Sequence, residues 1–169
     1  MENWSVAIED MASAAAAASR KLFKRYALKL EEELLSQDQI LEEQFKFISA
    51  ALSDPKLVNT GAMARLIFML GVEINFFTAR QKEILLQLVH TNCRHFIHEE
   101  AANALADFIA RRYDVRLAIP LFREWLADSD DNVKRMGIFG FDVLRRKKDS
   151  TPEVKAEALK AIVEARRSH

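Results

Sequence analysis

One apolar pattern recurs three times along the chain and restricts the fold more than any other feature of the sequence. Each copy has a β-branched residue, a small residue four positions later, a large apolar residue four further on, and another three beyond that. The copies are Val58/Ala62/Leu66/Met69, Ile97/Ala101/Leu105/Phe108 and Val133/Gly137/Phe141/Leu144. On a helix that turns about 100° per residue these positions fall within roughly 80°, so each copy predicts one buried helical stripe. The copies begin 39 and then 36 residues apart, a period typical of helical solenoids.

The rest of the chain also has the pattern of an all-α protein. No glycine or proline precedes Pro55, and apolar residues recur at helical spacing from Trp4 to Leu34, which predicts one long helix or two ending near Ser36. Residues that commonly begin helices stand before later periodic segments. We expect further helices over residues 37–52, 54–71 (ended by Gly71), 79–91 and 96–112, two within 114–144, and one over 152–165. No alternating apolar pattern is long enough to predict a strand.

The stretch from residue 117 to 144 has a proline inside its first helix, an acidic turn, and glycines inside its second helix. It resembles a HEAT repeat, the two-helix unit of armadillo-type solenoids. The features that carry the resemblance are Pro120 midway in the first helix, Asp128 at the turn, and Val133 followed by the basic Lys134. In this family such a proline bends the first helix around the stack. The small residue Gly137 is expected where a neighbouring helix approaches closely.

The resemblance extends more loosely over residues 37–146. The first copy shares the turn "LSDPKLV" but has Asn59 where the family often carries arginine, and the second copy lacks the aspartate at its turn. The resemblance implies a short right-handed HEAT-like superhelix forming one all-helical domain over residues 1–169. Three helix pairs (37–146) are expected between an N-terminal helical cap (1–36) and a C-terminal capping helix (151–167), since a short solenoid needs covered ends.

Reactive side chains gather at one place, "HTNCRHFIHEE", which holds His90, Cys93, His95 and His98. This is the composition of a metal site, but Cys93 and His95 are closer in sequence than paired zinc ligands usually are. A loop with exposed imidazoles is the simpler interpretation, so we expect no metal and no cofactor.

There is also no glycine-rich phosphate loop and no serine elbow. The sequence therefore favours a protein that is not an enzyme.

The charge balance bears on the class of partner. Lysine plus arginine equals aspartate plus glutamate, 25 each, so no overall field draws the chain to nucleic acid or membrane. Basic clusters do occur at residues 20–25, 111–116 and 145–148, and some HEAT-like proteins, including alkylpurine DNA glycosylases, bind DNA. These clusters lie near expected helix C-termini, where cations favour the helix dipole. Nucleic-acid binding is therefore the alternative and not the first expectation.

The expected compartment is the cytoplasm. The alanine-rich segment over residues 14–18 is preceded by acidic residues and followed by basic ones, the reverse of an export signal. The longest apolar run elsewhere is far shorter than a membrane span. The single cysteine, Cys93, suits a reducing environment.

Protein binding through the concave face of the stack is the expected function. Positions two, six, nine and thirteen after the start of each copy point away from the buried stripe. They are Thr60, Ala64, Ile67 and Gly71; Glu99, Asn103, Ala106 and Ala110; and Arg135, Phe139, Asp142 and Arg146. The candidate binding residues among them are Glu99, Asn103, Arg135, Phe139, Asp142 and Arg146. A phenylalanine among arginines and an aspartate has the composition of an interface hot spot; the alternative is that Phe139 is covered by the C-terminal helix or by a second copy of the chain.

The size and resemblance of the chain lead to one more specific expectation. A small, neutral, non-catalytic solenoid would suit a bacterial immunity protein or antitoxin that occludes the active site of a cognate toxin. An adaptor subunit of a larger complex fits equally well. The sequence does not distinguish these roles, and it does not give the oligomeric state.

Overall fold

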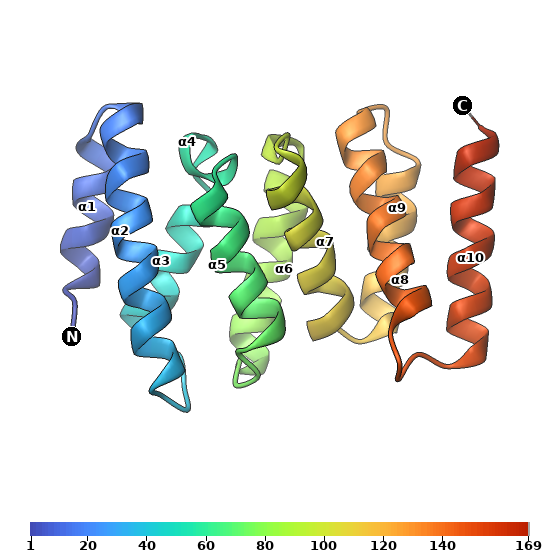
Figure 1. Cartoon of the computed structure of the whole chain (residues 1–169), viewed down its shortest axis with the longest axis horizontal. Helices are drawn as coiled ribbons and strands as arrows, with labels where there is room; N and C mark the ends of the chain where they lie inside the picture. Colours follow the sequence, from blue (N-terminus) through green and yellow to red (C-terminus); the bar gives the residue numbers. More distant parts are fainter. Residues whose placement is uncertain (169) are drawn as a thin grey trace.

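The computed structural model describes residues 1–168, and within that range the chain forms ten α-helices, one short 3₁₀ helix and no strand (Figure 1). The helices are α1 (Trp4–Ser13), α2 (Ala16–Leu35), α3 (Glu42–Leu52), α4 (Pro55–Val58), α5 (Gly61–Val72), α6 (Ala79–Asn92), η1 (Cys93–His95), α7 (Glu99–Arg112), α8 (Val115–Leu126), α9 (Asp131–Arg146) and α10 (Pro152–Arg167). The expectation of an all-α fold is confirmed.

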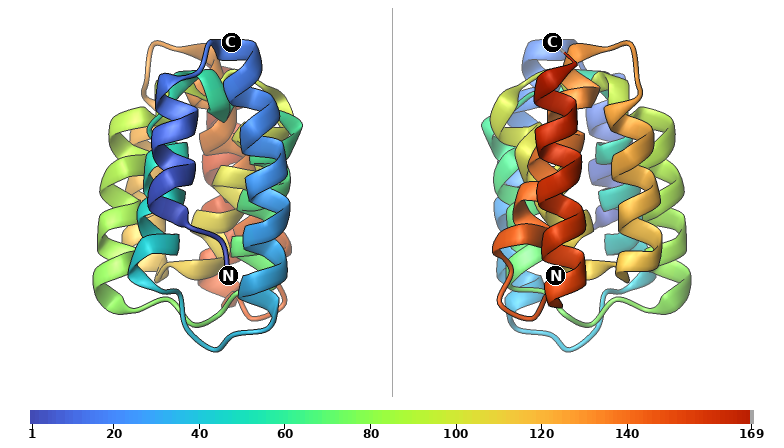
Figure 2. Two further views of the ribbon diagram at one scale, coloured as in Figure 1. Left: turned by 90° about the vertical axis from the view of Figure 1, so that its left-hand side faces the viewer. Right: turned by 90° about the vertical axis from the view of Figure 1, so that its right-hand side faces the viewer.

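The helices form two layers that run side by side along the molecule (Figures 1 and 2). We call α2, α5, α7 and α9 the inner layer; these four helices run in the same direction (Figure 1). The outer layer consists of α1, α3, α6 and α8, and α10 closes the C-terminal end of the stack (Figure 2). This arrangement is compatible with a helical solenoid. None of the helices in residues 1–168 is long and apolar enough to cross a membrane.

The expected starts of α6, α8 and α10 are confirmed. Thr78, Asp114 and Thr151 each accept a hydrogen bond from a backbone N–H in the first turn of the helix that follows. Pro152 occupies the first turn of α10, where its missing N–H needs no partner. Helix α8 continues through Pro120. Local capping chemistry therefore fixes where these helices begin.

Four expected helix boundaries are wrong, one of them being the start expected at residue 96, since α7 begins at Glu99. The segment 54–71 forms two helices, because Thr60 caps a new helix by accepting from the Met63 N–H (3.1 Å). Gly71 lies inside α5 and does not end it. Residues 37–41 precede the start of α3 and are not helical. The open question at the N-terminus is also answered, since α1 and α2 are separate helices.

The repeated stripe is buried as expected, with two departures. Ile97 is 60% exposed, and its neighbour Phe96 fills the core position at 1% exposure. The reason is that α7 begins only at Glu99, so Ile97 lies before the helix and not on its buried face. Ala62 is only partly buried. The other members of the three copies are buried in one continuous core.

Close helix contacts explain three of the glycines. A Cβ on Gly137 would lie 2.9 Å from the backbone oxygen of Phe122 in α8, and one on Gly140 would lie 2.5 Å from the ring of the same residue. A Cβ on Gly71 would lie 3.3 Å from the Cα of Phe108 in α7. The expectation that Gly137 allows close helix approach is therefore confirmed, and Gly140 and Gly71 have the same role.

Four of the polar contacts between different units share one sequence spacing. Four pairs of side chains join residues that are 34 positions apart. They are Glu31 with Arg65, His90 with Glu124, Arg94 with Asp128, and Arg123 with Glu157. The shared spacing is compatible with a repeating unit of about this length.

Asn59, which follows α4, makes three hydrogen bonds to the segment that precedes α7. Its Oδ1 accepts from the N–H groups of Ile97 (2.8 Å) and His98 (2.9 Å), and its Nδ2 donates to the His95 carbonyl (2.8 Å).

We expect Asn59→Ala to lower the free energy of unfolding by about 1–2 kcal/mol. The loss is limited to this range because the groups are partly exposed and regain water when these bonds are lost. Chemical denaturation measures the change. Asn75→Ala, in an exposed loop, is the control and should alter stability by less than about 0.5 kcal/mol; equal effects would contradict this role.

Candidate binding surface

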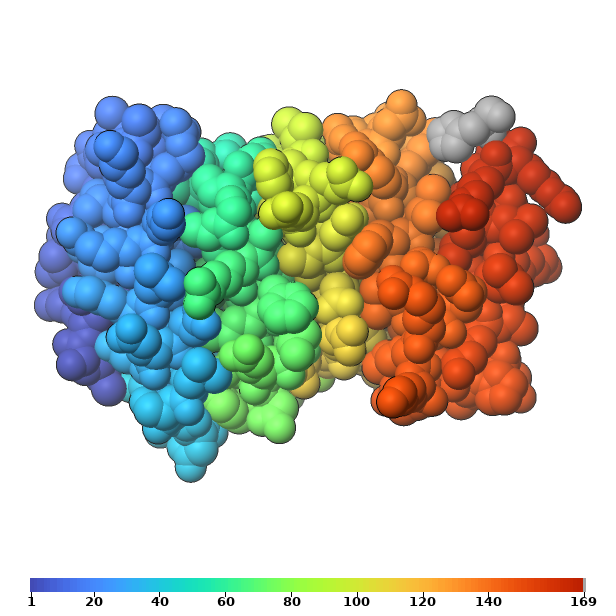
Figure 3. Space-filling model, viewed as in Figure 1, coloured from blue at the N-terminus to red at the C-terminus, as the bar shows by residue number. Residues whose placement is uncertain are grey.

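The inner layer presents one broad face to solvent, on which α2, α5, α7 and α9 lie as adjacent bands (Figure 3). The positions that the sequence predicts to point outward are open to solvent on α9, but several on α5 and α7 are not. Ile67, Gly71, Ala106 and Ala110 are buried, because each of these helices has an inner-layer neighbour on both sides. On α5 the exposed stripe lies one residue further along the helix than expected and includes Arg65, Phe68 and Val72.

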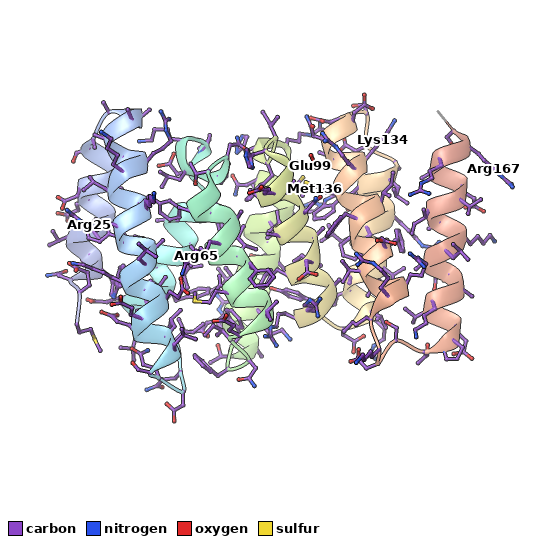
Figure 4. All side chains as sticks on the ribbon, in the orientation of Figure 1. Arg25, Arg65, Glu99, Lys134, Met136 and Arg167 are labelled. Atoms are coloured by element: carbon purple, nitrogen blue, oxygen red, sulfur yellow. The ribbon has the colours of Figure 1, made fainter. Side chains whose placement is uncertain are left out.

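The six predicted binding residues fall into two groups on this face. Glu99, Asn103 and Arg135 line a narrow crevice between the N-terminal halves of α7 and α9, next to Met136 (Figure 4). This crevice has no free volume for a ligand. The other three residues lie toward the C-terminal end of α9. The six predicted residues therefore fall in two groups and do not form one compact site.

Two residues of the second group, Phe139 and Arg146, line a larger hollow, which we call the α7/α9 groove. Its volume is about 710 Å³. It is lined by Gly71, Val72, Asp107, Arg111, Arg112, Phe139, Val143, Arg146, Lys147, Lys148 and Asp149. Phe139 is half-buried in this groove, and no residue of α10 is among those lining it. Asp142 accepts from Arg146 (2.9 Å) and Arg145 (2.7 Å) beside the groove.

Several cations of the α7/α9 groove already have partners within the fold. Arg112 donates to the Leu70 carbonyl near the end of α5 (3.2 Å), and Lys147 donates to the Ala110 carbonyl near the end of α7 (3.3 Å). Burial, together with the charge of Arg111, lowers the pKa of the Arg112 guanidinium. These cations bind carbonyls that a helix end leaves without internal partners. Their contribution is therefore largely structural.

A second hollow lies between α2 and the N-terminal half of α5, and we call it the α2/α5 groove. Its volume is about 630 Å³. It is lined by Ala17, Arg20, Lys21, Lys24, Ala27, Leu28, Glu31, Thr60, Gly61, Ala62, Arg65 and Leu66. Arg65 pairs with Glu31 through two hydrogen bonds of 2.9 and 3.1 Å, and this pairing raises the pKa of the Arg65 guanidinium. Figure 4 shows Arg65 on α5, at the inner face.

Phe68 lies on α5 between Arg65 and Val72, which line one groove each. Arg65 lines the α2/α5 groove and Val72 lines the α7/α9 groove, and both lie on the exposed stripe of α5. Phe68 stands between them on the same stripe and is 54% exposed. Apart from Phe68 and Val72, the large apolar side chains of α5 are buried.

The histidine and cysteine cluster does not converge on a common point. His90 pairs with Glu124 across α6 and α8, while His95 and His98 are exposed. Cys93 is buried, and burial, followed by the nearby charge of Asp128, raises the pKa of its thiol. In the part of the chain that the structure describes, no three side chains of metal-ligating type come together.

Sequence reasoning missed Phe68 and the α2/α5 groove. The basic cluster at residues 20–25 is visible in the sequence, but its position opposite Gly61 and Arg65 follows only from the packing of α2 against α5. The signal for Phe68 is its spacing from Arg65 and Val72, three and four residues away, which puts all three on one helix face.

No family model matches the chain, and no curated protein and no solved structure matches it significantly. The proposals below accordingly rest on the residues and distances described above.

Proposed function

We propose that this chain is a non-catalytic protein-binding module whose partner docks on the exposed face of the inner layer. The observation that carries the proposal is the open Phe68 between two grooves on a single face. Aromatic residues and arginine are enriched where proteins bind one another, and a few central aromatic anchors supply most of the binding energy. Phe68 is such an anchor, with the exposed Leu28 on the neighbouring helix α2; Phe139 lies further away, on α9 beyond α7.

The finer form of the proposal is a HEAT-like solenoid that acts as a bacterial immunity protein or antitoxin. The constant 34-residue spacing of contacts between units supports the HEAT-like description. A flat-sided stack with hollows on one face suits occlusion of a partner's active site. The free cysteine, Cys93, is in keeping with a reducing, cytoplasmic compartment. An adaptor subunit of a larger complex would use the same face.

Site-specific photo-crosslinking tests where the partner docks. A benzophenone amino acid is placed at Phe68 or at Leu117, which is 52% exposed on α8 in the outer layer and serves as the matched control. We expect one partner protein, identified by mass spectrometry from the native cells, to crosslink to the Phe68 position and not to the Leu117 position. Equal crosslinking at both positions, or at Leu117 alone, would contradict docking on the inner layer.

The immunity role has its own test once that partner is purified. An equimolar amount of the chain should suppress a toxic enzymatic activity of the partner, and Phe68→Ala should restore that activity. A partner that has no such activity would instead support the adaptor role.

A further inference from the structure

We infer that the α2/α5 groove binds an acidic, amphipathic segment of the partner protein, with its carboxylates on Arg20, Lys21 and Lys24 and its apolar side chains over Leu28. This inference rests on the proposed protein-binding function and specifies the chemistry of the partner. Three independent features of the groove support it: its cations, its floor and its closed end.

The cations of this groove are not neutralised by the fold. Arg20, Lys21 and Lys24 lie on one side of α2 and line the groove. Within residues 1–168 none of the three makes an ion pair or donates a side-chain hydrogen bond, whereas Arg65 at the other side is held by Glu31. Most cations of the α7/α9 groove, by contrast, have acceptors. A face with uncompensated positive charge attracts a partner of negative charge and speeds its association.

The floor of the groove is apolar and has free space. Ala17, Ala27, Ala62 and Leu66 line it, and Leu28 is 40% exposed there. A Cβ on Gly61 would meet no atom of the described chain within 4 Å, so the backbone of α5 is open at this point. Apolar side chains of a bound segment would fill this space and exclude water. A ligand with charge alone would leave the floor unused.

The end of the groove at Glu31 limits what can bind. Its carboxylate is paired with Arg65, and together they form a polar boundary beyond Leu28. An acidic segment is therefore directed toward Lys21 and Lys24. Among the residues that the structure describes, no aromatic side chain lines the groove, so it offers unpaired bases no stacking surface. The chemistry fits an acidic peptide better than a nucleic acid.

A designed peptide is the probe for this inference. It is a fluorescein-labelled helix of about 18 residues, five turns, with leucines on one face and glutamates on the other. Fluorescence anisotropy measures its binding to the full chain at about 50 mM and about 300 mM salt, since screening weakens exposed ion pairs. We expect binding that weakens at the higher salt. A peptide with lysines in place of the glutamates, and single-stranded DNA, should bind at least tenfold more weakly.

Charge reversal locates the binding site. Lys21→Glu combined with Lys24→Glu should weaken peptide binding at least tenfold, since each exposed ion pair contributes up to about fivefold and reversal adds repulsion. Arg166→Glu combined with Arg167→Glu is the control. It makes the same change in net charge on α10, where Figure 4 shows Arg167 at the far end of the molecule from α2. All four side chains are exposed, and circular dichroism verifies that both variants are folded.

Three outcomes would overturn the inference. They are no peptide binding at low salt, an equal loss of peptide affinity in both double variants, and tighter binding of DNA than of the peptide. The outcome is separable from the test of the proposed function. If a partner crosslinks at Phe68 but binds the Lys21→Glu/Lys24→Glu variant with wild-type affinity, the acidic-segment inference fails and protein binding on the inner layer stands.

Discussion

Gly137→Ala is expected to lower the free energy of unfolding by about 1–3 kcal/mol, the usual cost of forcing a methyl group into a packed interior. The new Cβ would lie 2.9 Å from the Phe122 carbonyl oxygen and 3.1 Å from the Leu126 backbone nitrogen. Because both atoms belong to the backbone of α8, rotation of a side chain cannot relieve the contact. Helices α8 and α9 would have to move apart, and urea denaturation measures the loss.

Gly61→Ala is the matched control. Gly61 begins α5, and the methyl group of an alanine there would have no atom of the described chain within 4 Å. None of the described glycines has positive φ. Alanine at this position should leave stability unchanged or raise it by about 0.4–1 kcal/mol, because it restricts the unfolded chain. Equal destabilisation by the two substitutions would show that close approach of α8 and α9 is not the reason for Gly137.

At Gly140 an added methyl group would contact a side chain, not backbone atoms as at Gly137. The added Cβ would lie 2.5–2.7 Å from three ring atoms of Phe122. We expect Gly140→Ala to lower the free energy of unfolding, and Phe122→Leu in the same chain to recover part of that loss. The two changes in unfolding free energy should therefore not be additive in a double-mutant cycle.

Glu33→Ala is expected to lower the free energy of unfolding by about 2–4 kcal/mol. It leaves a buried N–H of Trp4 and one of Gln44 without their acceptor, at about 1–3 kcal/mol each. The carboxylate of Glu33 accepts from Trp4 Nε1 (2.9 Å), Gln44 Nε2 (2.7 Å) and the Glu2 N–H (2.7 Å). Trp4 is 1% exposed and Gln44 is fully buried. These contacts join α1, α2 and α3, so the N-terminal end of the stack depends on them. Thermal or urea denaturation measures the loss, and Glu32→Ala, at the exposed neighbouring position, should have little effect.

The contribution of Glu33 should depend on pH. Burial raises its pKa, but the hydrogen bonds from Glu2, Gln44 and Trp4 outweigh burial and hold the pKa below the ordinary value of 4.5. A lowered pKa in the folded state means that the stabilisation is complete above the ordinary pKa and is lost as the pH falls through the folded value. The stability difference between wild type and Glu33→Gln should therefore shrink in acid. A difference that stays constant would contradict the ionised network.

The fold could be predicted from the sequence wherever local chemistry decides it. Capping residues such as Thr78 and Asp114 act within one turn, so the starts of α6 and α8 are correct. The break at Thr60 was missed because the apolar pattern runs across it without interruption. Ile97 and Phe96 are equally apolar, and only the position of the η1 turn decides which of them is buried.

The binding surface could be predicted less well, because it depends on how helices pack beside one another. Of the positions that the sequence predicts to point outward on α9, Phe139 and Arg146 line the α7/α9 groove. The sequence could not identify Ile67 and Ala106 as buried, since their burial comes from neighbouring units and not from their own helix. Phe68 was missed for the same reason, as its exposure follows from the one-residue shift of the exposed stripe on α5.

Titration of the purified partner against two alanine variants tests the central claim most directly. Phe68→Ala and Leu117→Ala remove side chains of nearly equal exposure, 54% and 52%, from the inner and outer layers. An anchor at the centre of an interface contributes about 2 kcal/mol or more, a loss of at least about 30-fold in affinity. Calorimetry should show this loss for Phe68→Ala and wild-type affinity for Leu117→Ala. Unchanged affinity for Phe68→Ala, or a comparable loss for Leu117→Ala, would contradict binding through the inner layer.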